Sequence, residues 1–266
     1  MKRLPFLLLF FIPLSLISQL RLAGIFGDSM VLQRDRPIPI WGWAGKNEKV
    51  TVQFNGQTKV AKTGADGKWM VTLQPVAYGG PFELSVKGKS NIVLKDVLVG
   101  DVWVCSGQSN MEWPLSAAMN AAEEIARANY PSIRHIQIIK DVAGQPRDQL
   151  RYSATWNSAS PGTAGSFTAV GYFFARELFE QTKIPIGLLN TSWGGTDVET
   201  WTSREAFEND PEFKEMIAAV PNINLDSMAK IKSEGMKQKL VSLQGKLPAG
   251  PSVASNWSGS SVAGLS

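Results

Sequence analysis

The sequence predicts an α/β fold preceded by a small all-β sandwich, and three observations support this. Residues 24–95 consist of short alternating segments separated by turn residues, which is typical of a β-sandwich. From Asp96 onward, apolar strands alternate with helical segments, which is typical of a parallel α/β sheet. One strand ends abruptly in Gly-Gln-Ser-Asn, ahead of a helix-compatible stretch. We therefore expect an accessory β-sandwich at 24–95, an α/β domain at 96–221, and a poorly defined helix with a Gly/Ser-rich tail at 222–266.

The clearest signal in the β-region is a hairpin. The segment Val50–Phe54 alternates, turns at Asn55-Gly56 and resumes as far as Ala61, and Asn-Gly between alternating segments strongly favours a two-residue hairpin. The same reasoning predicts strands at Lys68–Leu73, Phe82–Val86 and Ile92–Leu94. Three tryptophans of this region are able to stack on sugar rings, but core packing is the favoured role. They are Trp41, Trp43 and Trp69.

The α/β region is predicted to contain three strands and two helices. The strands are expected at Val97–Val104, Ile133–Ile139 and Ile184–Leu189, and the helices at Ala117–Asn129 and Thr168–Gln181. Binding sites in such sheets lie at the carboxyl ends of the strands. A sheet of three parallel strands leaves an unpaired edge and an uncovered face.

The most informative residue is Ser109, at the predicted strand-to-helix turn. A serine in this position presents its hydroxyl away from the sheet, beside the free N–H groups of a helix start, which favour a developing oxyanion. Nucleophilic serines occur at such turns. The run is not a Gly-x-Ser-x-Gly elbow, because Met111 stands where the second glycine would be.

Three blocks of the chain resemble the sialate O-acetylesterases, which are SGNH-type hydrolases with a flavodoxin-like α/β fold. The first block runs from Gly100 through Ser109 to Pro114. The other two blocks are Ile25–Gln33, which is similar to the opening of the accessory β-domain in bacterial members, and Leu188–Thr196, which is similar to the second conserved block. The resemblance covers roughly residues 24 to 207. It implies an α/β hydrolase sheet, acetyl-ester hydrolysis and no metal or cofactor.

The resemblance also assigns roles to residues. Ser109 is the expected nucleophile, and its backbone N–H together with that of Gly194 or Gly195 is expected to bind the oxyanion. The amides of Gln108 and Asn110 are expected to brace the turn or to contact substrate, with bracing favoured. Apart from the resemblance, Cys105 sits one residue before the turn on an apolar strand and is expected to be a buried small apolar side chain.

Two later blocks of the family have no counterpart here: a Gln-Gly-Glu-type block and the Asp-x-x-His block that supplies the general base. The chain contains one histidine, His135, for which a structural role is favoured over that of a base. Asp101 and Glu112 are candidate substitutes, although an unshifted carboxylate is a weak base. We therefore expect an apparently incomplete hydrolase sheet and little esterase activity from this chain.

The N-terminus predicts export. Lys2 and Arg3 precede the apolar run Leu4–Ile17, and this pattern over residues 1–18 is typical of a signal peptide, which implies a periplasmic or secreted protein. Without Lys2 and Arg3, 25 of the 27 basic residues remain against 23 acidic ones, with no dense basic run, so a nucleic-acid partner is not expected. A single cysteine excludes a disulfide framework and a cysteine-based zinc site.

Three functions are therefore compatible with the sequence. The favoured one is a carbohydrate O-acetylesterase acting on acetylated sialic acid or a related glycan. The alternatives are a non-catalytic carbohydrate-binding protein and an acetylesterase of plant polysaccharide. An acetylated carbohydrate is the expected partner, with no membrane span once the signal is removed.

Overall fold

The computed structural model describes residues 19–143, 147–213 and 233–239. Of these, residues 19–141 and 147–206 belong to one compact unit and the remainder to a second. The predicted signal peptide lies outside the described residues, as does most of the predicted tail at 222–266, of which residues 233–239 are helical.

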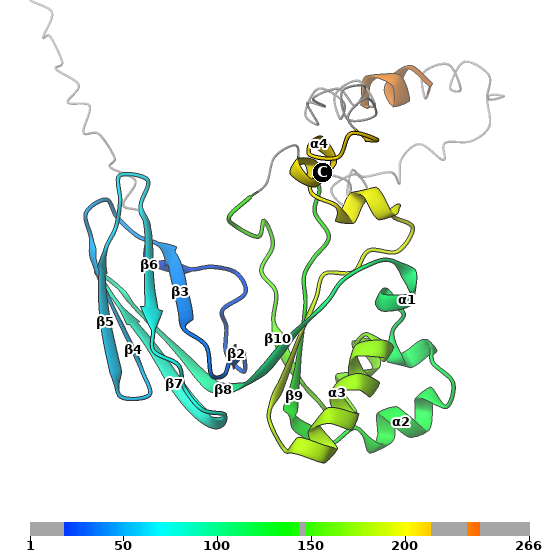
Figure 1. The fold of residues 1–266 in the computed structure, drawn as a ribbon, viewed down its shortest axis with the longest axis horizontal. Helices are drawn as coiled ribbons and strands as arrows, with labels where there is room; N and C mark the ends of the chain where they lie inside the picture. Colours follow the sequence, from blue (N-terminus) through cyan, green and yellow to red (C-terminus); the bar gives the residue numbers. More distant parts are fainter. Residues whose placement is uncertain (1–18, 144–146, 214–232, 240–266) are drawn as a thin grey trace, which may run out of the picture. The chain divides into compact units, whose positions relative to one another are not determined.

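The strands, labelled in Figure 1, are β1 (Arg21–Leu22), β2 (Val31–Gln33), β3 (Ile38–Trp43), β4 (Lys49–Phe54), β5 (Gln57–Lys62), β6 (Lys68–Leu73), β7 (Gly79–Lys87), β8 (Asn91–Cys105), β9 (Tyr130–Gln137), β10 (Trp156–Ala159) and β11 (Ile186–Asn190). The α-helices are α1 (Ser109–Glu112), α2 (Ala121–Arg127), α3 (Ala169–Thr182) and α4 (Arg204–Glu208). Short 3₁₀ helices are η1 (Leu115–Ala117), η2 (Ala164–Ser166) and η3 (Val198–Trp201).

The β-region packs two sheets around one apolar core. One sheet contains three strands in the order β1-β3-β6. Four strands in the order β8-β7-β4-β5 form part of a larger sheet. The hairpin between β4 and β5 turns at Asn55 and Gly56, both with positive φ, as the sequence predicts. The side chains of Trp43 and Trp69 are buried in this region, which confirms core packing for both, while Trp41 is half-buried against the Phe26 ring.

β8 is the strand that joins this region to the α/β region. Its first part pairs with β7 in antiparallel fashion, residues 98–100 pair with β2, and residues 101–105 pair with β11 in parallel fashion. One uninterrupted strand therefore crosses the predicted boundary at 95/96. Where the pairing changes, Gly100 lies so close to β11 that a Cβ would be 1.9 Å from the Pro185 carbonyl oxygen.

The α/β region confirms the predicted fold class. Parallel strands lie in the order β9-β11-β8, and β10 adds an antiparallel edge strand to β9. α3 packs against this sheet through a second apolar cluster that includes Phe167, Tyr172 and Leu188. α3 begins within one residue of the predicted helix, with the Thr168 hydroxyl accepting from the Gly171 N–H as its N-cap.

The predicted helix 117–129 is wrong in its first part. Asn120 adopts a left-handed conformation and separates η1 from α2, which begins only at Ala121. Asn tolerates this conformation better than most other non-glycine residues, and here it is the N-cap from which α2 starts.

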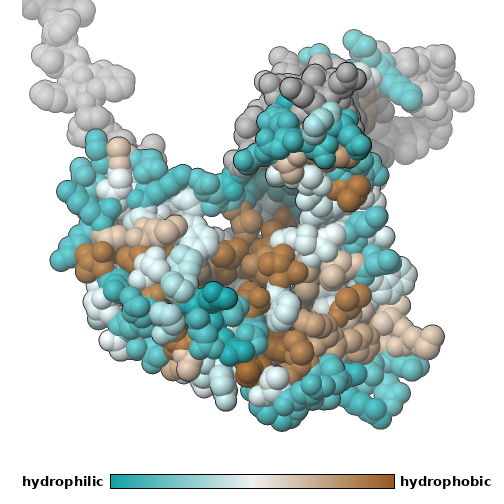
Figure 2. Space-filling model, viewed as in Figure 1, coloured by the Kyte–Doolittle hydropathy of each residue, from teal (hydrophilic) through white to brown (hydrophobic). Residues whose placement is uncertain are grey.

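Apolar side chains remain exposed on the α/β region, and brown atoms gather in Figure 2 over the area where Figure 1 shows the sheet and α3. The exposed large apolar residues of α3 and of the 101–105 part of β8 are Trp103, Val104, Val170 and Phe174. The Trp103 and Phe174 rings meet edge to face at 4.9 Å. None of the helices in the described segments is long and apolar enough to span a membrane.

Candidate active site at the carboxyl ends of the parallel strands

The turn after β8 places Ser109 at the first position of α1. Gly107 supplies the positive φ of 120° that lets the chain leave the strand and enter the helix. Ser109 is exposed, and within residues 19–143, 147–213 and 233–239 no hydrogen bond engages its hydroxyl or its N–H. The structure therefore presents Ser109 at the carboxyl edge of the sheet, where the sequence predicts it.

A second turn, after β11, lies beside the first. The Thr191 N–H donates to the Cys105 carbonyl at 2.9 Å, and the Trp193 N–H donates to the Gly107 carbonyl at 2.8 Å. These two main-chain bonds hold the turns together. A Cβ at Gly194 would lie 3.4 Å from the Ser109 Cα and 2.8 Å from a carboxylate oxygen of Glu112.

The two glycines of this turn have different surroundings. Gly194 has no positive φ, and its would-be Cβ meets the end of the Glu112 side chain, which would have to shift to admit it. Gly195 has φ +76° and nothing within 4 Å of its would-be Cβ, so it is required by backbone conformation. The structure thus brings Gly194 against Ser109 and leaves Gly195 exposed next to it.

Glu112 contacts both neighbouring strand ends. The Gly194 N–H donates to one carboxylate oxygen, and Lys140, three residues beyond β9, forms an ion pair with the other. The hydrogen bond from Lys140, followed by the one from the Gly194 N–H, holds the pKa of the Glu112 carboxyl below its usual range. The Lys140 ammonium also lies 5.5 Å from the centre of the Trp193 ring. Glu112 is therefore ionised and paired, so it is poorly suited to act as a general base.

The amides of Gln108 and Asn110 do not brace the turn in the way the sequence analysis favoured. Both residues are exposed, and neither side chain forms a hydrogen bond with another described residue. The main-chain bonds to Cys105 and Gly107 brace the turn instead, and they involve no particular side chain. Contact with a bound molecule stays a prediction for both amides.

A partly buried amide network lies below the second turn, and the sequence did not predict it. The Asn190 side chain donates to Gln137 at 2.8 Å and accepts from the N–H and hydroxyl of Ser192, at 3.0 and 2.6 Å. Asn190 is 1% exposed, so the formal glycosylation sequon beginning at Asn190 is not accessible. A signal was present in the sequence: Asn190 and Gln137 are polar residues at the ends of two apolar strands.

His135 lies in the core under α3. It is 2% exposed, and its ring stacks on Phe167 with centroids 4.5 Å apart. Burial lowers its pKa to about 4. Its Nε2 has no hydrogen-bond partner among the described residues. This environment fits the favoured structural role and favours a neutral ring at physiological pH.

Two other residues considered from the sequence, Asp101 and Cys105, have partners or surroundings of their own. Asp101 pairs with Ile186 at the amino end of β11, roughly 13 Å along the strand from Cys105 at 3.3 Å per residue. There it accepts from Arg34 at 2.8 Å, so it does not serve as the nearby base that the sequence analysis considered. Cys105 is 5% exposed, and burial raises the pKa of its thiol to about 11, which confirms it as a buried small side chain.

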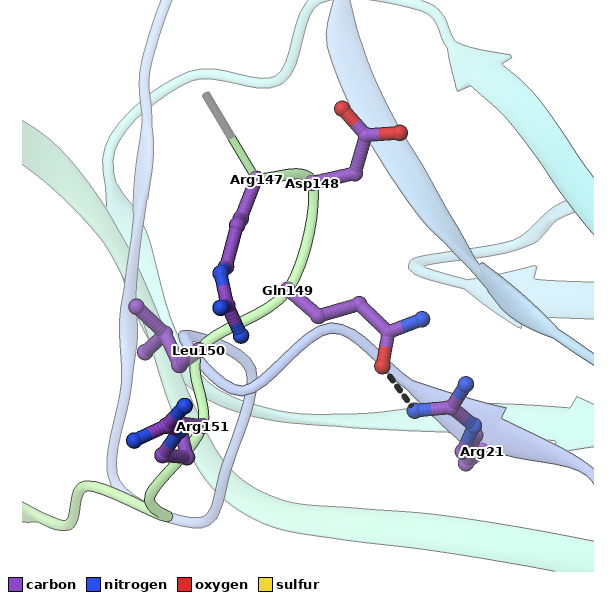
Figure 3. A pocket seen from close by; sticks show the side chains of 6 residues that line it. All are labelled: Arg21, Arg147, Asp148, Gln149, Leu150 and Arg151. Carbon is purple, nitrogen blue, oxygen red and sulfur yellow. Dashed lines mark hydrogen bonds between the residues drawn. The ribbon is translucent and has the colours of Figure 1, made fainter. Parts of the chain in front are cut away.

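Two cavities of about 530 and 640 Å³ lie elsewhere, along the 147–151 segment. Figure 3 shows the first, where Gln149 accepts a hydrogen bond from Arg21 at 2.5 Å and the Arg147 guanidinium extends toward Leu150 and Arg151. Neither is lined by Ser109. Within the part of the chain that the structure describes, no group of three or more His, Cys, Asp or Glu residues is arranged to hold a metal ion.

An exposed serine at a helix start, at the carboxyl edge of a parallel sheet and beside a glycine turn, is an arrangement typical of α/β hydrolases. Comparison with known families defines which one. The family described as carbohydrate esterase, sialic acid-specific acetylesterase, matches residues 99–233, just over half of the chain. The chain belongs to this family, which confirms the resemblance seen in its sequence blocks.

Individual relatives agree with this assignment. The chain is 37% identical over 207 residues to sialate O-acetylesterase of Mus musculus and 36% identical over 202 residues to that of Homo sapiens, covering 71% and 69% of this chain. A crystal structure of a carbohydrate acetylesterase from Xanthomonas citri is similar with a TM-score of 0.69 and 42% identity over 71% of this chain. The matches span 38% and 39% of the two mammalian relatives and 44% of the bacterial chain.

Proposed function

We propose that the protein is a carbohydrate O-acetylesterase that uses Ser109 as its nucleophile. The observation that carries this proposal is the position of Ser109, exposed at the head of α1 and in contact with the Gly194 turn. The family match covers both of these turns. An O-acetylated sialic acid is the substrate we favour, because the family description and the mammalian relatives name that sugar.

In this mechanism the Ser109 oxygen attacks the acetyl carbonyl carbon and its proton passes to a base. The sugar hydroxyl leaves with a proton, and water then hydrolyses the acyl-enzyme to acetate and free serine. The N–H groups of Ser109 and Gly195 are the oxyanion donors we assign, because neither has an acceptor among the described residues. The Gly194 N–H is already engaged by Glu112.

None of the described residues near Ser109 is well suited to act as its general base. The chain has one histidine, and it is buried under Phe167 with its pKa lowered. Glu112 is ion-paired, and Asp101 lies at the other end of the strand. We therefore propose that this 266-residue chain hydrolyses acetyl esters slowly, since nothing described near Ser109 takes its proton efficiently.

Hydrolysis of p-nitrophenyl acetate by the chain and by Ser109→Ala tests the nucleophile. We expect slow turnover that falls to background in Ser109→Ala, and trapping of an acetyl group on Ser109 by mass spectrometry after acid quenching. Turnover unchanged by Ser109→Ala would show that Ser109 is not the nucleophile. Comparing an O-acetylated sialic acid with acetylated xylan then separates the two proposed substrate classes.

A second candidate function is carbohydrate binding without catalysis. The specific observation in its favour is the burial of His135 in the core. Background rates in both proteins, together with binding of the deacetylated sugar, would favour this function over hydrolysis.

A further inference from the structure

Three strand ends meet at one carboxylate. Glu112 follows β8, Lys140 follows β9, and the Trp193-Gly194 pair follows β11. Glu112 accepts from the Gly194 N–H through one oxygen and pairs with Lys140 through the other. This side chain is therefore the point where all three parallel strands are connected beyond their ends.

The Glu112 carboxylate lies so close to Gly194 that a side chain at position 194 would require Glu112 to shift. A Cβ there would be 2.8 Å from the same carboxylate oxygen and 3.6 Å from the Ser109 Cβ. The bond is also charge-assisted, because a paired carboxylate is the acceptor. Lys140 is held in turn over the Trp193 ring at 5.5 Å, so both ends of the ion pair contact the same turn.

We propose that Glu112 is a positioning residue, which holds the Gly194 turn against Ser109 and so sets the distance between the nucleophile and the oxyanion donors. The proposal deepens the proposed function and rests on it for its kinetic consequences. Its structural part, the fixing of the Gly194 turn, is measurable without any hydrolysis.

Lys140 completes this arrangement through its charge. An unpaired carboxylate beside the turn would repel the negative charge that develops on the ester oxygen. Pairing with Lys140 cancels this repulsion and leaves the hydrogen bond to Gly194 intact. Lys140→Met is therefore expected to slow acylation while the Gly194 turn keeps its position.

Amide hydrogen exchange at Gly194, followed by NMR in ¹⁵N-labelled protein, measures the positioning directly. We expect exchange about tenfold faster in Glu112→Ala than in the unmodified chain, because the N–H loses its acceptor. Glu112→Gln should fall between them, since its amide oxygen still accepts. The matched control is Glu123→Gln, which removes the same charge from the exposed pair with Arg127. Equal Gly194 exchange in Glu112→Ala and the unmodified chain would overturn the proposal.

Kinetics with p-nitrophenyl acetate measure the consequence for the reaction. A positioning role predicts that kcat falls in Glu112→Ala with KM little changed, that Glu112→Gln restores part of the rate, and that Glu123→Gln has no effect. A change in KM alone would contradict this role. If the unmodified chain shows no Ser109-dependent turnover, the proposed function fails, whereas the exchange result still decides the positioning of Gly194.

Discussion

The two halves of β8 lie in different surroundings although they form one strand. Residues 91–96 alternate between exposed and half-buried positions as part of the sandwich, and residues 97–100 are buried throughout. Beyond Gly100 the strand is paired with β11, and Trp103 and Val104 are 44% and 65% exposed. Residues 97–100 are thus enclosed, whereas the segment that follows them carries the Ser109 turn and is more open.

This difference shows how a rigid scaffold positions an exposed site. The sandwich holds β8 through antiparallel pairing with β7, and the same strand delivers Ser109 to the edge of the parallel sheet. The link between the halves is the close approach at Gly100, and the first prediction breaks it.

Gly100→Ala is expected to have the largest effect. Its Cβ would lie 1.9 Å from the Pro185 oxygen and 2.6 Å from the Pro185 carbonyl carbon, so β8 and β11 must separate. We expect a loss of at least about 4 kcal/mol in the free energy of unfolding, measured by urea denaturation. Gly27→Ala is the control, because its nearest neighbour would be Trp156 at 4.0 Å. A loss below about 1 kcal/mol in Gly100→Ala would show that the strands are not tightly joined there.

Truncating one core residue in each half tests whether the halves unfold together. Leu84 in the sandwich core and Leu188 under α3 are both 0% exposed. Each Leu→Ala variant should lose about 3 kcal/mol through lost transfer energy and cavity formation. Because β8 belongs to both cores, we expect a single calorimetric transition that both variants lower. Two transitions, each responding to one variant, would show that the sandwich folds independently of the sheet.

The smallest effect concerns pH. The pKa of His135 is about 4 in the folded chain and about 6.5 when unfolded, so the unfolded chain binds the proton first as the pH falls. Above pH 6.5 both states are mostly neutral at His135, and protonation there costs little stability. As the pH falls from 7 to 5, protonation of the unfolded chain lowers the free energy of unfolding by about 2 kcal/mol. His135→Leu should remove that part of the pH dependence in urea titrations. An unchanged dependence in His135→Leu would place the titrating group elsewhere.

Local signals in the sequence were sufficient for elements with strong periodicity or turn chemistry. The Asn55-Gly56 hairpin, β6 and α3 lie within a residue or two of their predicted bounds, because each depends on neighbours in the chain. The edge strand β10 was not predicted, since Trp156–Ala159 has only four residues, of which two are polar. Residues 79–81 lie within β7, beside a shift in register, whereas the strand predicted from the sequence begins only at Phe82.

In the candidate site, too, some features were predictable from local sequence and others were not. The positions of Ser109 and the glycine turn followed from motifs at strand ends. The pairing of Glu112 with Lys140 and Gly194 joins residues 28 and 82 positions apart in the chain, so no local pattern contains it. Glu112 was a candidate base because it is a carboxylate near Ser109 in the sequence, and only its three-dimensional partners show that it is engaged.

The register between β8 and β11 sets how the two turns of the site are aligned. Cys105 is the partner of Asn190 in the β8–β11 pairing, and Ser109 and Gly194 each come four residues later along their own segments. The nucleophile turn and the glycine turn are therefore equal in length and start level with each other. Substitutions at exposed positions in either turn leave this count unchanged, whereas inserting or deleting one residue in either turn would displace Ser109 from Gly194. The spacing of the site is thus set by the number of residues in each turn.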